Sequence, residues 1–403
     1  MDIIFSGNIR KDRYFCLFLI YEEKKQNLES ICQGLLSLGF SRAKAFMNLL
    51  MASCSYLEAK SVVGLTASRH YHYHYSNISK VSDNLCKDEE EYGKVSGTLL
   101  YYFVSTCPVP VSKTGSGVMY YSFSQDMCMI YKSASACLPD KVYGHQANSL
   151  GAGIVEGYKL GFTHLHASKD WALPIAIEIV APEGNATDLA VRQLNNLIAD
   201  DSLPFGKTLC INNVDSGYGN ARYLSPLHAH KNLINIARLH GSMKVYPVFS
   251  GEQKVKSNPK IYGKTYYLTS QMLSKKGYYL FSKQNLFLGK FQTPDKVHFL
   301  SHLLVILASW WLMYAAKDEV ELKVPVWQQY SAKNKEVLFA QETNEKAELT
   351  PSQVRKGMEN LFDTFDKTPY LPTKYKKGKG REKGTILTKR EKHKTVKKSK
   401  NKT

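Results

Sequence analysis

Hydrophobic positions follow two spacings along the chain, and each spacing predicts a different kind of structure. Between residues 27 and 65 they recur three or four residues apart, which predicts the apolar faces of two helices. Ser41 stands just before the second helical run, where its hydroxyl would cap the helix. From residue 98 onward, shorter apolar runs bounded by Gly, Pro and Asp predict strands at 99–104, 117–123, 171–181, 208–214, 232–239 and 243–249.

Three further helices are predicted at 188–199, 297–316 and 350–365. Strands followed by a helix and then another strand fit a mixed α/β sheet of ribonuclease H type better than a doubly wound sheet. The last helix has an apolar face that could dock on the core or on a second subunit, and we favour the core.

Positive charge is concentrated at the C-terminal end. The chain carries a formal net charge of +19, and its last thirty residues hold fourteen Lys or Arg against two Glu. Such a segment has too few apolar residues to fold alone. It predicts a polyanion as partner, because binding releases counterions; a solubilising terminus is the alternative.

Cysteine and histidine spacing gives little support for a metal site. The eight cysteines include no CxxC pair, which predicts reduced thiols rather than disulfides or a zinc site. In the run RHYHYHY at 69–75, His70, His72 and His74 would share one face of a strand and could hold a metal. No acidic or cysteine ligand accompanies them, so an aromatic packing strip is the favoured interpretation.

One segment, 297–316, is apolar and long enough to cross a membrane. It contains His298 and His302 between charged flanks, so we predict a helix buried in a globular core. The apolar patch at 14–21 is too short to span a bilayer and lacks a small-residue cleavage site, so no signal peptide is predicted. These features predict a cytoplasmic protein.

The strand at 208–214 delivers one carboxylate, Asp215, at its C-terminal end. In open α/β sheets, ligands bind at the carboxyl ends of strands, where loops are free to shape a site. Asp215 is therefore the first candidate site residue. Because Asp also begins turns and caps helices, a purely structural role is an equal alternative.

Several segments, in order along the chain, resemble one protein family. They are PFGKTLCINNVDSGYGNARYLSPL, NLINIARLHGSMKVYP, NPKIYGKTYYLTS, FSKQNLFLGKFQTPD, ASWWLMYAAKDEVE and LTPSQVRKGMENLFDTFD, followed by the basic KKGKGREKG. The chain resembles the DDE transposases of bacterial insertion sequences, in the group with a tyrosine, arginine, glutamate and lysine signature. The resemblance covers most of the chain from Leu99 onward.

This resemblance implies a function and the residues that carry it. Family members hold two divalent ions, Mg²⁺ or Mn²⁺, between two aspartates and a glutamate on a ribonuclease H-like sheet, and they cleave and join DNA. Asp215 matches the second aspartate, a metal ligand, and Lys283 matches the signature lysine that touches phosphate. The tail residues expected to bind nucleic acid are Lys374, Lys376, Lys377, Lys379, Arg381, Lys383, Lys389 and Arg390.

The resemblance also implies partners and a division of the chain. The expected partner is DNA, at the terminal repeats of an insertion sequence in the bacterial nucleoid, with a homodimer as one assembly and with neither a membrane nor a small-molecule substrate. The predicted regions are a helical, DNA-binding N-terminal domain at 1–97, the first part of the catalytic core at 98–250, the remnant of a β-rich insertion at 251–280, a core helix region at 281–330, a helical segment at 331–372 and a disordered basic tail at 373–403.

Two positions depart from the family pattern. Aligned on Pro108 and Pro110, the first-acid position holds Ser105, and the third-acid position holds Lys276. No Asp or Glu occurs between Glu252 and Asp295, and the interval is shorter than in the family, as after an internal deletion. We therefore predict a degenerate transposase with impaired catalysis; the alternative is a non-catalytic DNA-binding relic or an inhibitor of an intact transposase. Asp126 and Glu178 lie near predicted strands as substitute acids, but spacing does not select either.

Overall fold

The computed structural model describes residues 27–107, 109, 111–132, 138–146, 153–238, 244–245, 266–267, 281–282, 285–293, 295–320, 322 and 348–365. Lys276, Lys283 and the whole basic tail lie outside these residues, as does most of the predicted insertion remnant. Ser105 and Asp215 are described, so the structure places two of the predicted site positions.

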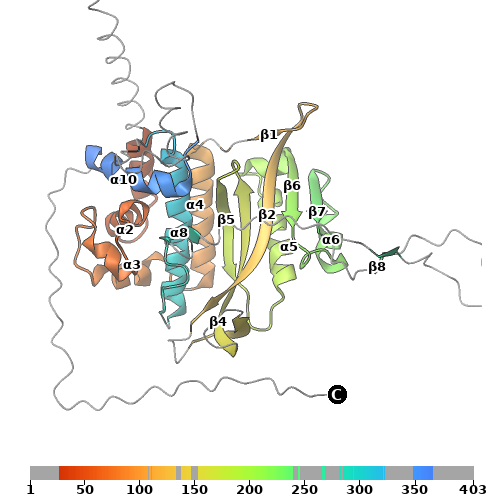
Figure 1. Cartoon of the computed structure of the whole chain (residues 1–403), viewed down its shortest axis with the longest axis horizontal. Coiled ribbons are helices and arrows are strands. Elements are labelled where there is room, and N and C mark those ends of the chain that lie inside the picture. The colour runs from red at the N-terminus through yellow and green to blue at the C-terminus, as the bar shows by residue number, and fades with distance from the viewer. Residues whose placement is uncertain are drawn as a thin grey trace, which may run out of the picture.

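A mixed, open sheet of seven strands forms the centre of the described structure (Figure 1). Its antiparallel half is built on β2 (Met119–Tyr131), which pairs with β4 (Gly153–His166) and with the short β1 (Ser112–Lys113). Strand β4 also pairs antiparallel with β3 (Val142–Gln146) and β5 (Ala172–Ile179). The predicted strands at 117–123 and 171–181 are therefore confirmed as parts of β2 and β5.

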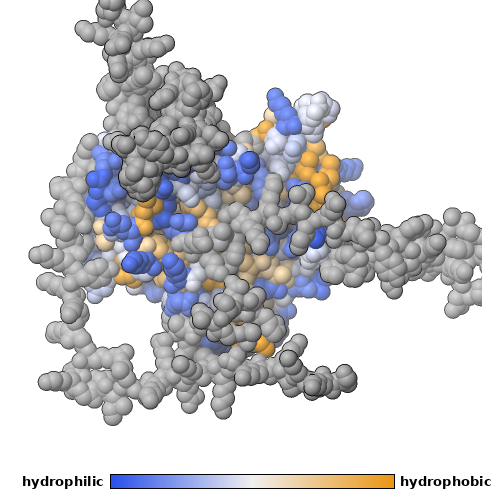
Figure 2. All heavy atoms as spheres, in the orientation of Figure 1, coloured by the Kyte–Doolittle hydropathy of each residue, from blue (hydrophilic) through white to orange (hydrophobic). Residues whose placement is uncertain are grey.

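The parallel half of the sheet lies on the other side of β2. There β2 pairs parallel with β6 (Leu209–Val214), and β6 pairs parallel with β7 (Leu233–Ala237). Both strands were predicted, and together they confirm the α/β class and the mixed sheet. Separately, β8 (Lys244–Val245) pairs with β9 (Tyr266–Tyr267). Figure 2 shows hydrophobic residues exposed near the β6–β7 edge, and Ile234 and Ile236 of β7 are exposed.

Helix α5 (Ala186–Ala199) covers one face of β4. Asn185 caps it by accepting a hydrogen bond from the backbone N–H of Thr187 at 2.8 Å. Gly161 of β4 faces this helix so closely that a Cβ there would lie 2.9 Å from the Leu189 side chain. The helix predicted at 188–199 is confirmed, and its predicted apolar residues are buried: Leu189, Val191, Leu194, Leu197 and Ile198.

A second helix, α6 (Ala221–Leu227), connects the parallel strands β6 and β7. Parallel neighbours cannot be joined by a tight hairpin, so a crossover of this kind is required. Asn220 caps α6 by accepting a hydrogen bond from the backbone N–H of Tyr223 at 3.1 Å. The short 3₁₀ helix η2 (Pro204–Lys207) leads into β6. The loop between β6 and α6 therefore begins at a strand paired on both sides and ends at the Asn220 cap of α6.

Helices α4 (Glu89–Thr106) and α8 (Lys296–Ala316) cover the opposite face of the sheet (Figure 1). Tyr158 of β4 stacks on Phe299 of α8 with ring centroids 5.1 Å apart. The indole N–H of Trp311 donates to the carbonyl oxygen of Pro174 in β5 at 2.9 Å. Helix α8 lies against β5, and β4 and β2 separate β5 from β6, the strand that ends at Asp215.

Outer helices surround α8 on the side away from the sheet: one over 27–37, α2 (Ala43–Ser55), α3 (Asn77–Leu85) and α10 (Pro351–Phe365), with the 3₁₀ helix η1 (Val63–Ala67) beside them. Arg355 of α10 is buried, and its guanidinium donates to the carbonyl oxygens of Ser53 and Tyr56, each at 3.0 Å. These carbonyls end α2, where the helix dipole favours a cation. Helix α10 thus docks on the core, as predicted.

Within the described residues, α8 is the one helix long and apolar enough to cross a membrane. Protein surrounds it, since 94% of its most apolar stretch is buried. His302 is also buried, with a ring nitrogen 3.0 Å from the carbonyl oxygen of Leu286. The prediction of a core helix is confirmed.

Residues 99–104 are helical rather than β, which corrects the first predicted strand. They belong to α4, where Tyr92, Val95, Leu99 and Phe103 recur at helical spacing and are buried. Asp88 caps the helix by accepting from the backbone N–H of Glu91 at 2.8 Å. The helix runs through 97/98, the expected border between the helical domain and the core.

Two alternatives raised for the helical region do not occur. Residues 69–75 form turns and irregular backbone rather than a strand, so His70, His72 and His74 do not share a strand face. Aromatic packing, the favoured interpretation, is present: His70 packs edge-on against Phe362 at 5.5 Å and Tyr71 against Tyr73 at 6.3 Å between ring centroids. Ser41 does not cap α2, because the capping position is Arg42, which has a left-handed φ of 58° and makes no side-chain cap.

Candidate functional site

Two carboxylates lie next to each other where the pairing between β2 and β6 ends. The parallel register pairs Gln125 with Val214 as its last partners. Asp126 follows Gln125 on β2 and Asp215 follows Val214 at the end of β6, so both side chains leave the sheet at the same level. We call Asp126 and Asp215 the acidic pair. Loss of hydration, and then the neighbouring charge of Asp215, raise the pKa of Asp126.

Each carboxylate of the acidic pair has one oxygen oriented by the backbone. Asp126 Oδ1 accepts from the N–H of Met127 at 2.7 Å, and Asp215 Oδ1 accepts from the N–H of Gly217 at 2.8 Å. The second oxygen of each, Oδ2, has no protein partner in the part of the chain that the structure describes. Asp215 therefore does begin a turn, as the structural alternative predicted, and still presents a free oxygen.

Close backbone approach shapes the loop after Asp215. A Cβ placed on Gly217 would lie 3.0 Å from Asp215 Oδ1, nearer than side-chain carbons normally come. Glycine therefore allows the 2.8 Å hydrogen bond that orients the carboxylate. The sequence DSG, which predicts only a turn, thus also sets the direction of the acid.

Beneath the acidic pair runs a set of hydrogen-bonded buried side chains, which we call the amide network: Gln125, Thr163, Gln193, Asn212 and Tyr223. Gln125 Nε2 donates to Thr163 Oγ1 at 2.9 Å and to the carbonyl oxygen of Ala190 at 2.8 Å. The Thr163 hydroxyl donates to Gln193 Oε1 at 2.9 Å. These bonds join β2 to β4 and α5, and they hold the residue that precedes Asp126.

The amide network also reaches the strand that carries Asp215. The Tyr223 hydroxyl of α6 donates to Gln125 Oε1. Asn212 Nδ2 donates to the Tyr223 oxygen at 2.7 Å and to Asn235 Oδ1 at 2.9 Å. Buried polar groups are stable only when partnered, and connected groups restrain one another. The network therefore fixes β2 and β6 relative to each other directly behind the acidic pair.

Tyr218 lies in the loop after Asp215. Its side chain is 3% exposed, and its ring centroid lies 5.2 Å from that of Tyr223. Its hydroxyl oxygen is buried and has no hydrogen-bond partner among the described residues. Loss of hydration, followed by the negative charges of Asp126 and Asp215, raises the pKa of Tyr218, so the hydroxyl stays neutral and keeps its proton.

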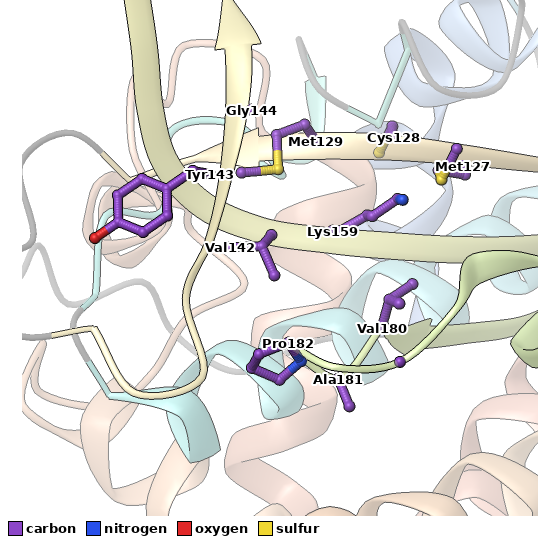
Figure 3. A pocket seen from close by; sticks show the side chains of 11 residues that line it. Met127, Cys128, Met129, Val142, Tyr143, Gly144, Lys159, Val180, Ala181 and Pro182 are labelled. Carbon is purple, nitrogen blue, oxygen red and sulfur yellow. The ribbon is translucent and has the colours of Figure 1, made fainter. Parts of the chain in front are cut away.

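A cavity of about 410 Å³ lies between β2, β3, β4 and the segment that follows β5 (Figure 3). Residues 127–129, which directly follow Asp126, form one wall, and Tyr143 of β3 forms part of another. Lys159 of β4 lies opposite Met129 in the β2–β4 register and brings an ammonium group to the cavity. The volume lies in the range of small-molecule sites. The cavity thus combines mostly apolar walls with one cation, and neither Asp126 nor Asp215 lines it.

The predicted placement of Ser105 in this site is wrong. Ser105 lies in the last turn of α4, is exposed, and its hydroxyl donates to the carbonyl oxygen of Tyr102 at 2.9 Å. The wrong placement follows from predicting residues 99–104 as a strand of the sheet. The first-acid position was thereby matched to Ser105, which is a residue of helix α4. The strand that pairs with β6 is β2, so the residue beside Asp215 is Asp126.

The two substitute acids differ in position. Asp126 joins the site, whereas Glu178 lies on β5 and its carboxylate is 2.7 Å from the guanidinium of Arg192. Strand β4 separates β5 from β2, so Glu178 is remote from the acidic pair. Sequence spacing offers no means of choosing between these acids. One feature of the sequence could have favoured Asp126. It lies in a long strand in which Tyr121, Phe123 and Gln125 are buried at every second position.

The acidic pair offers the ligands that a small divalent cation prefers. Mg²⁺ takes oxygen ligands and is usually held by one or two carboxylates, with water and substrate phosphate completing its shell. The two unpartnered Oδ2 atoms fit this requirement. No group of three His, Cys, Asp or Glu suited to a metal occurs in the described residues, and the predicted third-acid position, Lys276, lies outside them.

The chain matches no protein-family model, no curated protein and no solved structure.

Proposed function

We propose that this protein binds DNA and, with Mg²⁺ or Mn²⁺ held by Asp126 and Asp215, cleaves and joins strands at the ends of an insertion sequence. The observation that carries the proposal is the position of Asp126 beside Asp215, which gives the site a second carboxylate. Impaired catalysis was predicted from two positions without an acid, Ser105 and Lys276. If Asp126 serves in place of Ser105, only Lys276 still argues for impaired catalysis.

The fold supports the proposal at the level of architecture. The antiparallel strands β2, β4 and β5, with the short β3 between β2 and β4 in the chain and paired with β4, are followed by α5, by the parallel strand β6 and by the crossover to β7. This order fits a mixed sheet of ribonuclease H type, as the resemblance implies. Asp215 at the carboxyl end of β6 occupies the region where open α/β sheets bind ligands.

The residues of the site have separate tasks in this proposal. A bound divalent ion acts as a Lewis acid and stabilises the charge that develops on phosphate oxygens. Asp126 and Asp215 would hold that ion, while the N–H groups of Met127 and Gly217 keep one oxygen of each carboxylate in place. Without a cation the two negative charges repel DNA phosphate, so the proposed activity depends strictly on metal.

The experiment is a nicking assay with a supercoiled plasmid that carries the DNA flanking the gene of this protein. We expect Mg²⁺- or Mn²⁺-dependent nicking, abolished in Asp126→Asn and in Asp215→Asn. Asp170→Asn, an exposed acid at the β4–β5 turn, and Ser105→Ala are the controls and keep activity. Nicking that survives both site substitutions contradicts the proposal and indicates a contaminating nuclease.

A second candidate function is DNA binding without cleavage, as a relic or an inhibitor of an intact transposase. Lys276 in the predicted third-acid position, in an interval with no Asp or Glu, favours it. A lysine repels cations where the family places an acid. Specific binding to the element ends at a salt concentration that abolishes tail-driven binding, without any nicking, supports this second function.

A further inference from the structure

The cavity between β2, β3, β4 and the segment after β5 gathers apolar side chains that solvent reaches (Figure 3). Met127 of β2 is 39% exposed and Tyr143 of β3 is 65% exposed, and both line the cavity. Covering such side chains with a ligand is favourable, because apolar surface is removed from water. The volume of about 410 Å³ lies within the range of small-molecule sites.

Lys159 brings a positive charge into this cavity. It stands opposite Met129 in the register between β4 and β2, so the two side chains leave the same face of the sheet. Figure 3 shows the Lys159 side chain extending between Met127 and Val180. Its ammonium makes no hydrogen bond or ion pair with the described residues, and no Asp or Glu occurs among the described residues that line the cavity. An anionic ligand would supply the missing counter-charge.

The walls around Lys159 favour an aromatic ring as the body of the ligand. Met127 and Met129 both line the cavity, and methionine sulfur makes favourable contacts with aromatic rings at about 5 Å. Their unbranched side chains also adapt to the shape of a ligand. Gly144 of β3 keeps the space open, since a Cβ there would lie 3.1 Å from the Met129 side chain.

We propose that this cavity binds a small aromatic molecule with one anionic oxygen group, the ring lying against Met127 and Met129 and the anion at Lys159. Burial of the ring supplies apolar contact, and the ammonium donates a charge-assisted hydrogen bond to the anionic oxygen. Neither Asp126 nor Asp215 lines the cavity, so this inference is independent of the proposed metal site.

The test is a titration of the full-length protein with 1-naphthoate, followed by nuclear magnetic resonance of carbon-13-labelled methionine methyl groups. We expect the signals of Met127 and Met129 to shift, and that of Met313, which is buried in α8, to stay in place. Met127→Leu and Met129→Leu assign the two signals. The uncharged 1-naphthamide, which has the same ring, should bind about 3- to 5-fold more weakly, as expected for the loss of an ion pair that stays partly exposed.

Variants separate the contribution of the charge from that of the cavity. Lys159→Gln should weaken binding of 1-naphthoate by about the same 3- to 5-fold and leave that of 1-naphthamide unchanged. Lys169→Gln is the matched control, because it removes the same charge at the exposed turn between β4 and β5, and it should keep the wild-type affinity. Gly144→Leu places a side chain in the cavity and should abolish the Met127 and Met129 shifts with both compounds.

Three results would overturn the proposal. The first is wild-type protein in which 1-naphthoate at millimolar concentration shifts neither methionine signal. The second is equal affinity of the wild type and Lys159→Gln for 1-naphthoate, which would deny Lys159 its role. The third is an unchanged shift in Gly144→Leu, which would place the ligand outside the cavity. None of these results affects the proposed function, which the nicking assay tests separately.

Discussion

Asp126 and Asp215 stand one residue beyond the last paired residues of two parallel strands, Gln125 and Val214. Behind them, Gln125 is tied through Tyr223 to Asn212, so the strand of one acid is bonded to the strand of the other. The two like charges are consequently held together by the fold rather than by attraction. Holding them together has a cost for stability that the proposed function explains, because a cation relieves the repulsion.

Replacing Asp126 by asparagine is expected to stabilise the protein in the absence of metal. The raised pKa of Asp126 means that the folded chain binds this proton more tightly than the unfolded chain does. That stabilisation is present at low pH and is lost as the pH rises above the ordinary value of 3.8 and through the raised pKa. Since asparagine cannot ionise, Asp126→Asn should unfold at a slightly higher temperature than the wild type at neutral pH.

The measurement is thermal unfolding in EDTA between pH 4 and pH 7, with Asp170→Asn as the matched control. The control lies at the β4–β5 turn and should follow the wild type. Added Mg²⁺ should raise the midpoint of the wild type and not that of Asp126→Asn. A variant that unfolds at a lower temperature than the wild type would show that the Asp126 carboxylate stabilises the fold.

Gln125→Leu should destabilise the protein and also reduce metal-dependent activity. The substitution leaves Thr163, Tyr223 and the carbonyl of Ala190 without their shared partner. Each unsatisfied buried group costs about 1 to 3 kcal/mol, so we expect the free energy of unfolding to fall by about 2 kcal/mol or more. Urea denaturation measures this value.

Asn213→Leu is the control for the amide network. Asn213 is exposed on β6 and makes one long bond, to the carbonyl oxygen of Phe123 at 3.4 Å. Exposed substitutions of this kind usually change stability by no more than about 0.5 kcal/mol. Equal destabilisation by Gln125→Leu and Asn213→Leu would mean that the network contributes nothing beyond the sheet itself.

Lys132 should make stability depend on pH above neutrality. It is fully buried after β2, its ammonium donates to the carbonyl oxygen of Phe291, and it lies 4.0 Å from the centre of the Phe299 ring. Burial lowers the pKa of Lys132 to about 7 from 10.5. Between these values the unfolded chain binds the proton more tightly, so stability should rise with pH, by at most about 1.4 kcal/mol per unit.

Urea denaturation of wild type and Lys132→Met between pH 6 and pH 10 tests this prediction. The rise with pH should be smaller in Lys132→Met and should persist in Lys159→Met, whose lysine lines the open cavity. A free energy of unfolding of the wild type that does not change from pH 7 to pH 10 would contradict this prediction. It would indicate that the Phe299 ring and the Phe291 carbonyl fully offset the cost of burying the Lys132 ammonium.

Removing the tail, residues 374–403, should weaken DNA binding without sequence preference. The segment carries twelve of the nineteen excess positive charges. The logarithm of the binding constant should fall less steeply with the logarithm of salt concentration, by about 0.9 for each phosphate that the tail neutralises in the full-length protein. Fluorescence anisotropy with duplex DNA from 50 to 200 mM salt measures the slope. Full-length Asp126→Asn should keep the wild-type slope, and an unchanged slope after truncation would assign DNA binding to the folded body.

The sequence by itself determined those elements whose signals are local. Strand β6 is a short apolar run between turn residues, α5 and α8 have apolar positions at helical spacing, and each was predicted close to its observed bounds. Asp215 was likewise predicted as the carboxylate at the end of its strand. Periodicity and turn chemistry depend on neighbouring residues only, so they can be interpreted without the fold.

Only the tertiary structure decided what lies beside Asp215. A short, continuous apolar run such as 99–104 fits a buried strand or a buried helix equally well. In the folded chain this run is part of helix α4, which packs against α8. The register that brings Asp126 to Asp215 joins strands that are far apart in the chain, and no local pattern contains that information. Register is set by which side chains the whole sheet buries, here through Gln125 and Asn212, so the partner of Asp215 is a property of the folded chain.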